Sequence, residues 1–348
     1  MSPADSLRAE AAKRILVKDG AYGTSIQARR LASDDYCRGL DLFKDQRGNN
    51  DLLNLTRPEL IEEIATEFAE AGVDILATNT FNANAISQAD YGAQAHVTAI
   101  NLAAARIVRR VADHYSQADG KQRWVAGALG PTNKTLSLSP DVNDPAYREV
   151  DFDTMKAVYR EQVDALVEGG VDFILIETIF DTLNAKAGIK AALEAGEALG
   201  RPLPLMISMT LTDLSGRNLS GHTVEAFWAS VRHAKPVTIG LNCSFGAAQL
   251  RPHLAALASK ADTLVMAYPN AGLPNELGEY DEAAAETAAQ VAEWIAGGLV
   301  NIVGGCCGTT AEHLAAIAEA ARGATPRQVP SGDGHTLLAG LEPMVLAA

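Results

Sequence analysis

Short apolar runs alternate with longer amphipathic segments along most of the chain. Eight of these runs are continuous blocks of apolar residues, rather than strict alternations of apolar and polar positions. Continuous apolar runs are typical of parallel strands, which are buried on both faces. We therefore predict strands at residues 15–17, 75–78, 124–129, 173–176, 205–209, 237–241, 263–267 and 301–303.

The intervals between these runs have the pattern of amphipathic helices. Residues 57–71 repeat apolar positions at helical spacing, and Gly72 is placed to end that helix. N-cap patterns predict where several helices begin. Thr56 with Glu59 and Thr309 with Glu312 read as capping boxes, and Asp153 is expected to open a helix that reaches residue 168.

Eight strand–helix units in one chain favour a closed (β/α)8 TIM barrel, an α/β fold. An open, doubly wound sheet is the alternative. Neither G-x-G-x-x-G nor G-x-x-x-x-G-K-[ST] follows any predicted strand, so nucleotide binding lacks its usual support. We expect the barrel at residues 10–322. Residues 323–348, with Pro326, Pro330 and Gly332-Asp-Gly334, read as a C-terminal linker or tail.

Charge and composition narrow the class of protein. The chain has 348 residues and a net charge of −14, which argues against nucleic acid or an anionic membrane as partner. No uncharged apolar run approaches the roughly 18 residues of a membrane span, and the first residues lack the apolar core of a signal peptide. Few cysteines, clustered in the sequence, favour a cytoplasmic location.

Three of the four cysteines lie where predicted strands end. Cys243 closes Gly240-Leu-Asn-Cys243, and Cys306 and Cys307 lie in Gly304-Gly-Cys-Cys-Gly308. The carboxyl ends of barrel strands meet on one face, so these thiols should converge there. Three thiolates with an open fourth position suit a catalytic zinc ion. The alternative is that they are buried thiols without chemistry. Cys37 lies in a polar segment and reads as structural or incidental.

Polar residues follow the same strands. A single strand-end Asp or Asn commonly caps the next helix, which is the alternative for each of them. Glu177 directly follows an apolar strand, so we expect its carboxylate to point inward and to need a partner. The long loop at residues 130–153, rich in Ser, Pro, Asn and Asp, is also expected on this face. The strand-end residues are Asp19, Gly20, Asn79, Thr80, Glu177, Thr178, Asn242 and Asn270.

Several of these motifs together resemble the zinc-dependent homocysteine S-methyltransferases. The three signatures are Asp19-Gly-Ala-Tyr-Gly-Thr24, Gly240-Leu-Asn-Cys243 and Gly304-Gly-Cys-Cys-Gly308. Further stretches are similar to the cobalamin-dependent methionine synthase branch, and the similarity extends over nearly the whole chain. They are Gly130-Pro-Thr-Asn133, Ser139-Pro-Asp-Val-Asn-Asp-Pro145, Glu177-Thr-Ile-Phe-Asp-Thr-Leu-Asn184, Leu219-Ser-Gly221 and Pro269-Asn-Ala-Gly-Leu-Pro274.

The resemblance implies a (β/α)8 barrel with zinc held by Cys243, Cys306 and Cys307. Homocysteine would enter the fourth position as a thiolate. Three cysteinates and Zn²⁺ sum to a charge of −1, which should leave a bound thiolate nucleophilic. Without homocysteine, we expect an oxygen ligand in the fourth position. Asn270 is the candidate and water is the alternative.

The resemblance also implies the substrate contacts. Asp19 and Glu177 match positions near the substrate amino group, and backbone N–H groups around Gly20 would bind its carboxylate. Asn242, beside Cys243, is a further expected substrate-binding residue.

The expected methyl donor is methylcobalamin on a separate corrinoid-binding protein or domain. The sequence has no Asp-x-His-x-x-Gly run, the pattern that places the axial histidine in the family's cobalamin module. Full methionine synthases continue into further modules, so we expect either a split subunit or part of a longer chain. Two alternatives remain: a homocysteine methyltransferase that uses S-methylmethionine or betaine, and a non-enzymatic zinc/thiol redox or storage protein.

Overall fold

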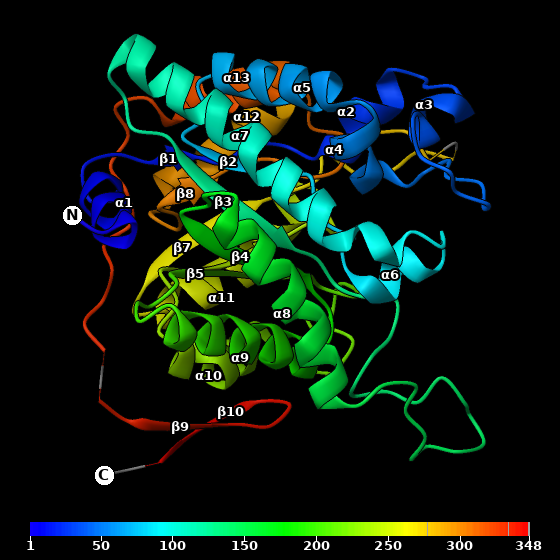
Figure 1. Ribbon diagram of the computed structural model, residues 1–348. Coiled ribbons are helices and arrows are strands. Elements are labelled where there is room, and N and C mark those ends of the chain that lie inside the picture. The colour runs from blue at the N-terminus through cyan, green and yellow to red at the C-terminus, as the bar shows by residue number, and fades with distance from the viewer. Residues whose placement is uncertain (277, 333, 347–348) are drawn as a thin grey trace.

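All eight predicted strands form one parallel barrel (Figure 1). The computed structural model describes residues 1–276, 278–332 and 334–346. Hydrogen-bonded neighbours follow the order β1-β8-β7-β6-β5-β4-β3-β2. The strands are β1 Leu16–Val17, β2 Ile75–Ala77, β3 Trp124–Leu129, β4 Phe173–Ile179, β5 Leu205–Met209, β6 Thr238–Asn242, β7 Leu264–Tyr268 and β8 Ile302–Val303.

The seam between β1 and β2 is closed by a short parallel pairing. Lys18 bridges Ile75, and the Asp19 N–H donates to the Ile75 carbonyl at 3.0 Å. The Asp74 N–H reaches the Val17 carbonyl at 2.8 Å. The fold is therefore the predicted (β/α)8 TIM barrel, and the open-sheet alternative is wrong.

Helices surround the barrel and cover the outer faces of its strands (Figure 1). In the described part of the chain, none is both long and apolar enough to cross a membrane. The α-helices are α1 Pro3–Ala11, α2 Tyr22–Ala28, α3 Ser33–Cys37, α4 Leu53–Thr56, α5 Pro58–Glu70, α6 Ala85–Ala89, α7 Val97–Asp119, α8 Phe152–Glu168, α9 Thr182–Ala198, α10 Val224–Val231, α11 Ala247–Lys260, α12 Ala284–Ala296 and α13 Ala311–Ala321. Short 3₁₀ turns are η1 Asn50–Leu52, η2 Gln94–His96 and η3 Arg232–Ala234.

Alternation along the strands divides the core into an inner and an outer part. In β4, Phe173 and Leu175 belong to the barrel interior, while Ile174 and Ile176 pack with the outer helices. Side chains alternate across a strand, so the next inward position is Glu177. The barrel interior is thus apolar near the amino ends and middle of the strands and becomes polar at their carboxyl ends. At the opposite end, Leu7 of α1 packs against the interior cluster.

The predicted helix starts were wrong by one or two residues. The helix predicted to open at Asp153 is α8, and its N-cap is Asp151, which accepts from the Thr154 N–H at 2.7 Å. In α13 the N-cap is Thr310 rather than Thr309, and its partner is His313 rather than Glu312. Ser, Thr, Asp and Asn have similar capping ability, so a sequence pattern locates a helix start only to within one or two residues.

The capping box predicted for Thr56 and Glu59 is absent. Thr56 is the last residue of α4, and α5 begins at Pro58 without a side-chain cap. Glu59 instead pairs with the Arg57 guanidinium at 2.5 Å. Proline at the first turn has no N–H that needs a cap, so the helix starts without the box.

The C-terminal segment is more ordered than a linker. Strands β9 Thr336–Ala339 and β10 Pro343–Leu346 form an antiparallel hairpin against α10. Before the hairpin, the buried Arg327 donates to the Ala258 carbonyl in α11 at 2.7 Å and to the Thr263 carbonyl, directly before β7, at 2.9 Å. The sequence did not predict the hairpin, and the domain boundary at residue 322 stays a prediction.

Replacing Gly240 by Ala should destabilise the barrel. A Cβ at this inward position of β6 would lie 2.0 Å from the Met266 carbonyl oxygen of β7, so the two strands would have to separate. We expect a loss of roughly 1–3 kcal/mol or more in the free energy of unfolding, measured with urea. The matched control is Gly23→Ala in α2, where the nearest atom is 3.8 Å away. Equal stability of the two variants would contradict the close strand contact.

Candidate active site and metal centre

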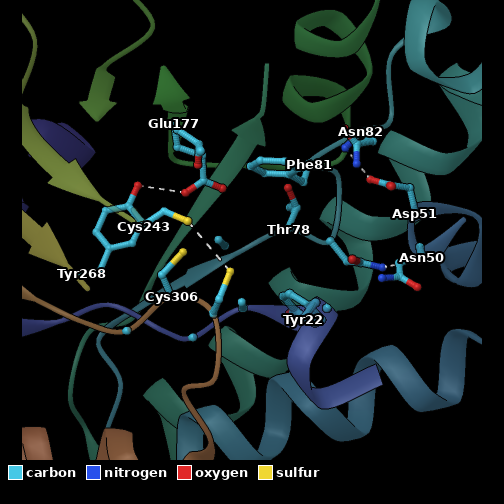
Figure 2. Close-up of a pocket in the computed structure, with 18 of the residues that line it drawn as sticks. Tyr22, Asn50, Asp51, Thr78, Phe81, Asn82, Glu177, Cys243, Tyr268 and Cys306 are labelled. Atoms are coloured by element: carbon cyan, nitrogen blue, oxygen red, sulfur yellow. Dashed lines mark hydrogen bonds between the residues drawn. The ribbon is translucent and has the colours of Figure 1, made fainter. Parts of the chain in front are cut away.

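Three cysteine sulfurs converge at the carboxyl end of the barrel (Figure 2). The sulfurs of Cys243, Cys306 and Cys307 all lie within 4.8 Å of one another, and those of Cys243 and Cys307 are 3.9 Å apart. Cys37 lies on α3 with its sulfur 3.9 Å from the Ser33 carbonyl, and it is not part of the cluster. The convergence of three strand-end cysteines is thus as predicted. That they bind a metal stays a prediction.

Tight backbone turns bring the sulfurs together. Cys243 has a φ of 61°, in the left-handed region, so the chain turns sharply as it leaves β6. After β8, a Cβ on Gly304 would lie 2.7 Å from the Lys18 carbonyl oxygen, and one on Gly305 would lie 2.1 Å from the Thr309 side chain. Glycine is therefore required at both positions, because the turn packs directly against β1 and the start of α13.

The donor set fits a tetrahedral metal ion. Zinc–sulfur bonds of about 2.3 Å give tetrahedral sulfur–sulfur distances of about 3.8 Å, close to the 3.9 Å between Cys243 and Cys307. Hydrogen bonds with Cys243 and Cys306 lower the pKa of Cys307, whereas hydrogen bonds with Cys243 and Cys307 raise the pKa of Cys306. One thiolate thus forms readily in the cluster, and a cation would displace the remaining protons.

The two asparagines predicted for the site differ in their contacts. The Asn242 side chain accepts from Ser208 Oγ at 2.7 Å and donates to Thr178 Oγ1 at 2.8 Å, and its amide lies 3.9 Å from the Cys306 sulfur. It therefore connects β4 and β5 to the sulfur cluster and does not line the cavity. Asn270 follows β7 and is buried, and its Oδ1 has no hydrogen-bond partner within the described residues.

A cavity of about 240 Å³ opens beside the sulfurs. Its walls combine a few charged and amide side chains with apolar and aromatic surface. Figure 2 shows Glu177 and Tyr268 beside Cys243, with Asp51 and Asn82 across the cavity. The lining residues are Lys18, Gly20, Ala21, Tyr22, Gly23, Gly48, Asn50, Asp51, Ala77, Thr78, Asn79, Phe81, Asn82, Glu177, Thr178, Cys243, Tyr268, Gly305, Cys306 and Cys307.

Glu177 points inward, as predicted. Its Oε2 accepts from the Tyr268 hydroxyl at 2.9 Å. Burial raises the pKa of Glu177, and the positive charge of Lys18 opposes that shift. Asp19 has no exposed surface and does not line the cavity. Its Oδ1 accepts from Lys18 Nζ at 2.8 Å and its Oδ2 from the Ala77 N–H at 2.7 Å.

Sequence reasoning missed four residues of this site. Lys18 and Tyr268 could have been found from alternation, because each lies two positions beyond an inward apolar residue of its strand. Asp51 lies on η1 in the long β1–β2 connection, where no strand end marks it. Tyr280 lies against Gly308, where a Cβ would be 2.3 Å from the Tyr280 Cβ. Burial, followed by the neighbouring cysteines, raises the pKa of Tyr280.

Comparisons with known proteins agree with this geometry. The sequence profile described as Homocysteine S-methyltransferase matches residues 16–321. The chain therefore belongs to the homocysteine S-methyltransferase family and is a methyltransferase. This excludes the alternative of a non-enzymatic redox or storage protein.

Solved structures have the same fold. The oxidized form of the homocysteine methyltransferase MmuM from Escherichia coli superposes with a TM-score of 0.70 at 23% identity, over 92% of this chain and 99% of that one. Its metallated form gives a TM-score of 0.68 at 22% identity, over 91% and 99% of the two chains. Because the sequence identities are this low, the two superpositions show a shared fold and not a shared substrate.

The stability of the protein should depend on the ionisation of Asp51. Burial raises the pKa of Asp51 from 3.8 to about 7, although the Asn82 N–H donates to its Oδ1 at 2.9 Å. Ionisation is thus harder in the folded than in the unfolded chain. Below about pH 4 Asp51 is protonated in both states, and its contribution to stability is complete. That contribution is lost as the pH rises through the folded-state pKa of about 7.

Asp51→Asn keeps an acceptor for the Asn82 N–H and cannot ionise. Its excess stability over the parent protein should grow from roughly 1.5 kcal/mol at pH 5 to roughly 4 kcal/mol at pH 8. Urea unfolding at both pH values measures this difference. Asp153→Asn, with a side chain that is 88% exposed, is the control and should show no such growth. A constant difference for Asp51→Asn would contradict the raised pKa.

Proposed function

We propose that this chain transfers a methyl group to the sulfur of homocysteine, using Zn²⁺ held by Cys243, Cys306 and Cys307. The observation that carries the proposal is the opening of the three-sulfur cluster onto a cavity that also contains Glu177. The cavity of about 240 Å³ is large enough for a small amino acid. Family membership supports homocysteine as the acceptor.

The donor set supports zinc over harder cations, because thiolate ligands select soft or borderline metals. When bound, zinc supplies the positive charge that keeps an acceptor sulfur deprotonated near neutral pH. Asn270 is the proposed oxygen ligand in the absence of substrate, with water as the alternative. The buried Oδ1 of Asn270, which lacks a hydrogen-bond partner in the described residues, supports this role.

The remaining groups of the cavity orient the amino-acid part of the substrate. Glu177 would accept hydrogen bonds from the ammonium group, and backbone N–H groups near Gly20 would bind the carboxylate. Both carboxylate oxygens of Asp19 already accept hydrogen bonds, so Asp19 would not contact the substrate ammonium directly. We propose that its negative charge helps Glu177 to attract the ammonium. Asn242 is proposed to support the site by holding Thr178 beside Cys306.

Methyl transfer to a thiol releases a proton from the acceptor and a leaving group from the donor. The acceptor thiol loses its proton to solvent on binding, and its lone pair then forms the new carbon–sulfur bond. The bond between the methyl carbon and the donor breaks with its electrons going to the donor. Phe81 and Tyr268 border the cavity and would limit water around a bound substrate sulfur.

We further propose that the donor is methylcobalamin on a separate corrinoid-binding protein or domain. Support comes from the motifs similar to the cobalamin-dependent branch, such as Pro269-Asn-Ala-Gly-Leu-Pro274, and from the absence of an Asp-x-His-x-x-Gly run in the sequence. Because the chain has a net charge of −14, docking onto a basic partner would be sensitive to salt. S-methylmethionine or betaine is the alternative donor.

Zinc content should depend on each of the three clustered cysteines. Cys243→Ser, Cys306→Ser and Cys307→Ser should each reduce bound zinc from about one equivalent to a small fraction, because a thiolate ligand is lost. Elemental analysis after dialysis measures this. Cys37→Ser is the matched control and should keep its zinc. Asn270→Ala should weaken zinc binding only without homocysteine. Loss of zinc from Cys37→Ser alone would reject the ligand assignment.

The methyl donor can be assigned by parallel assays. Methionine formation from homocysteine should be supported by a methylcobalamin-loaded corrinoid protein, more slowly by free methylcobalamin, and not by S-methylmethionine or betaine. A cobalt-free reaction with each donor is the control. Efficient methionine formation from S-methylmethionine without cobalt would reject the cobalamin proposal and leave the zinc and homocysteine assignments intact.

A further inference from the structure

Lys18 is a buried lysine in the wall of the cavity. Only 3% of its surface is exposed, and it follows β1 at the inward position two residues beyond Leu16. It is the only cationic side chain among the described residues that line the cavity, whereas Glu177 and Asp51 are both acidic. Lysine is almost never fully buried unless it is paired, so its partners decide its role.

The contacts of Lys18 leave part of its donor capacity free. Its Nζ donates to Asp19 Oδ1 at 2.8 Å and lies 4.5 Å from the centroid of the Tyr268 ring. An ammonium group has three N–H donors, and one hydrogen bond from Nζ is formed within the described structure. Since Lys18 lines the cavity, the remaining donors are available to a molecule bound there.

Lys18 remains charged in this environment. Burial alone lowers the pKa of Lys18, but the carboxylates of Asp19 and Glu177 and the nearby Cys306 outweigh it, so the net shift is upward. The Lys18 ammonium is held by Asp19 and the Tyr268 ring, so it can orient a ligand bound in the cavity.

The charges of the site require a cation for the substrate carboxylate. When ionised, Asp19 and Glu177 contribute two negative charges, and Lys18 contributes one positive charge. Three cysteinates with Zn²⁺ would add one more negative charge, so the site would have a net charge of −2 before the substrate binds. An α-amino acid brings both an ammonium and a carboxylate. Glu177 is matched to the ammonium. The carboxylate would otherwise enter negatively charged surroundings, and a buried unpaired charge is strongly unfavourable.

We infer that Lys18 is a specificity-determining residue that pairs with the α-carboxylate of the acceptor, opposite Glu177, which binds the ammonium. The inference rests on the proposed function and extends it. The site would then select, as methyl acceptors, thiols that carry both the ammonium and the carboxylate of an α-amino acid. Backbone N–H groups near Gly20 complement Lys18 but carry no full charge.

The test compares three thiols on the zinc-loaded full chain. They are L-homocysteine, 3-mercaptopropylamine, which lacks the carboxylate, and 4-mercaptobutanoate, which lacks the ammonium. Lys18→Met should weaken homocysteine and 4-mercaptobutanoate binding by about ten- to a hundredfold, the scale of a charge-assisted hydrogen bond, with 3-mercaptopropylamine little changed. Glu177→Gln should weaken binding of the two thiols that carry an ammonium. Titration calorimetry measures the affinities independently of turnover.

Two controls separate recognition from folding. Lys18→Met leaves Asp19 unpaired, so Lys18→Met with Asp19→Asn removes both charges and keeps an acceptor for the Ala77 N–H. Lys190→Met, on the outer helix α9 with a 48% exposed side chain, should change no affinity. Zinc content and thermal unfolding check that each variant is folded.

The loss of affinity for 4-mercaptobutanoate must appear in both the single and the double variant, because this thiol has no ammonium for Asp19 to stabilise. An equal loss for all three thiols in the Lys18→Met single variant would show that Lys18 only supports the fold and would overturn the inference. If the unaltered protein binds homocysteine but the Lys18→Met variant discriminates against 3-mercaptopropylamine as strongly as the unaltered protein does, the backbone alone binds the carboxylate and the inference is wrong. Failure of the unaltered protein to bind homocysteine would instead overturn the proposed function.

Discussion

The site depends on the buried ion pair between Lys18 and Asp19. These residues follow β1, and Asp19 also accepts the Ala77 N–H of β2, so the pair lies at the seam where the barrel closes. Gly304, which leads into the cysteine pair, packs against the Lys18 carbonyl. One contact therefore connects barrel closure, the acidic groups and the position of the cysteines. Without Lys18, the two buried carboxylates Asp19 and Glu177 would face each other's charge without compensation.

A closed barrel also explains why the polar groups gather at one end. Each strand directs every second side chain inward, and little space remains for water in the lower layers. Those layers hold residues such as Phe173 and Met266. The next inward position along each strand can be polar, because it faces the cavity rather than packed side chains. Glu177 and Tyr268 occupy such positions and bond to each other.

The strands and the fold class could be predicted because both follow from local patterns. Continuous apolar runs identify parallel strands, and eight of them in one chain favour a closed barrel. The cysteines were also predictable from their places after strands. The helix starts at Thr310 and Asp151 were missed by one or two residues, since adjacent polar residues have similar capping ability. The C-terminal hairpin was missed because its pairing stands out only once it packs against α10.

The sequence by itself determined which chemistry is possible: three thiols at strand ends, a carboxylate after an apolar strand, and no nucleotide motif. Only the tertiary structure decided which charged side chains pair with each other and which line the cavity. Asp19 was predicted to face the substrate, yet it is bonded to Lys18 and Ala77, and Lys18 takes the place in the cavity wall. Asp51 joins that wall from a distant loop. The physical reason is that burial and pairing depend on distances across the barrel, which local sequence patterns do not encode.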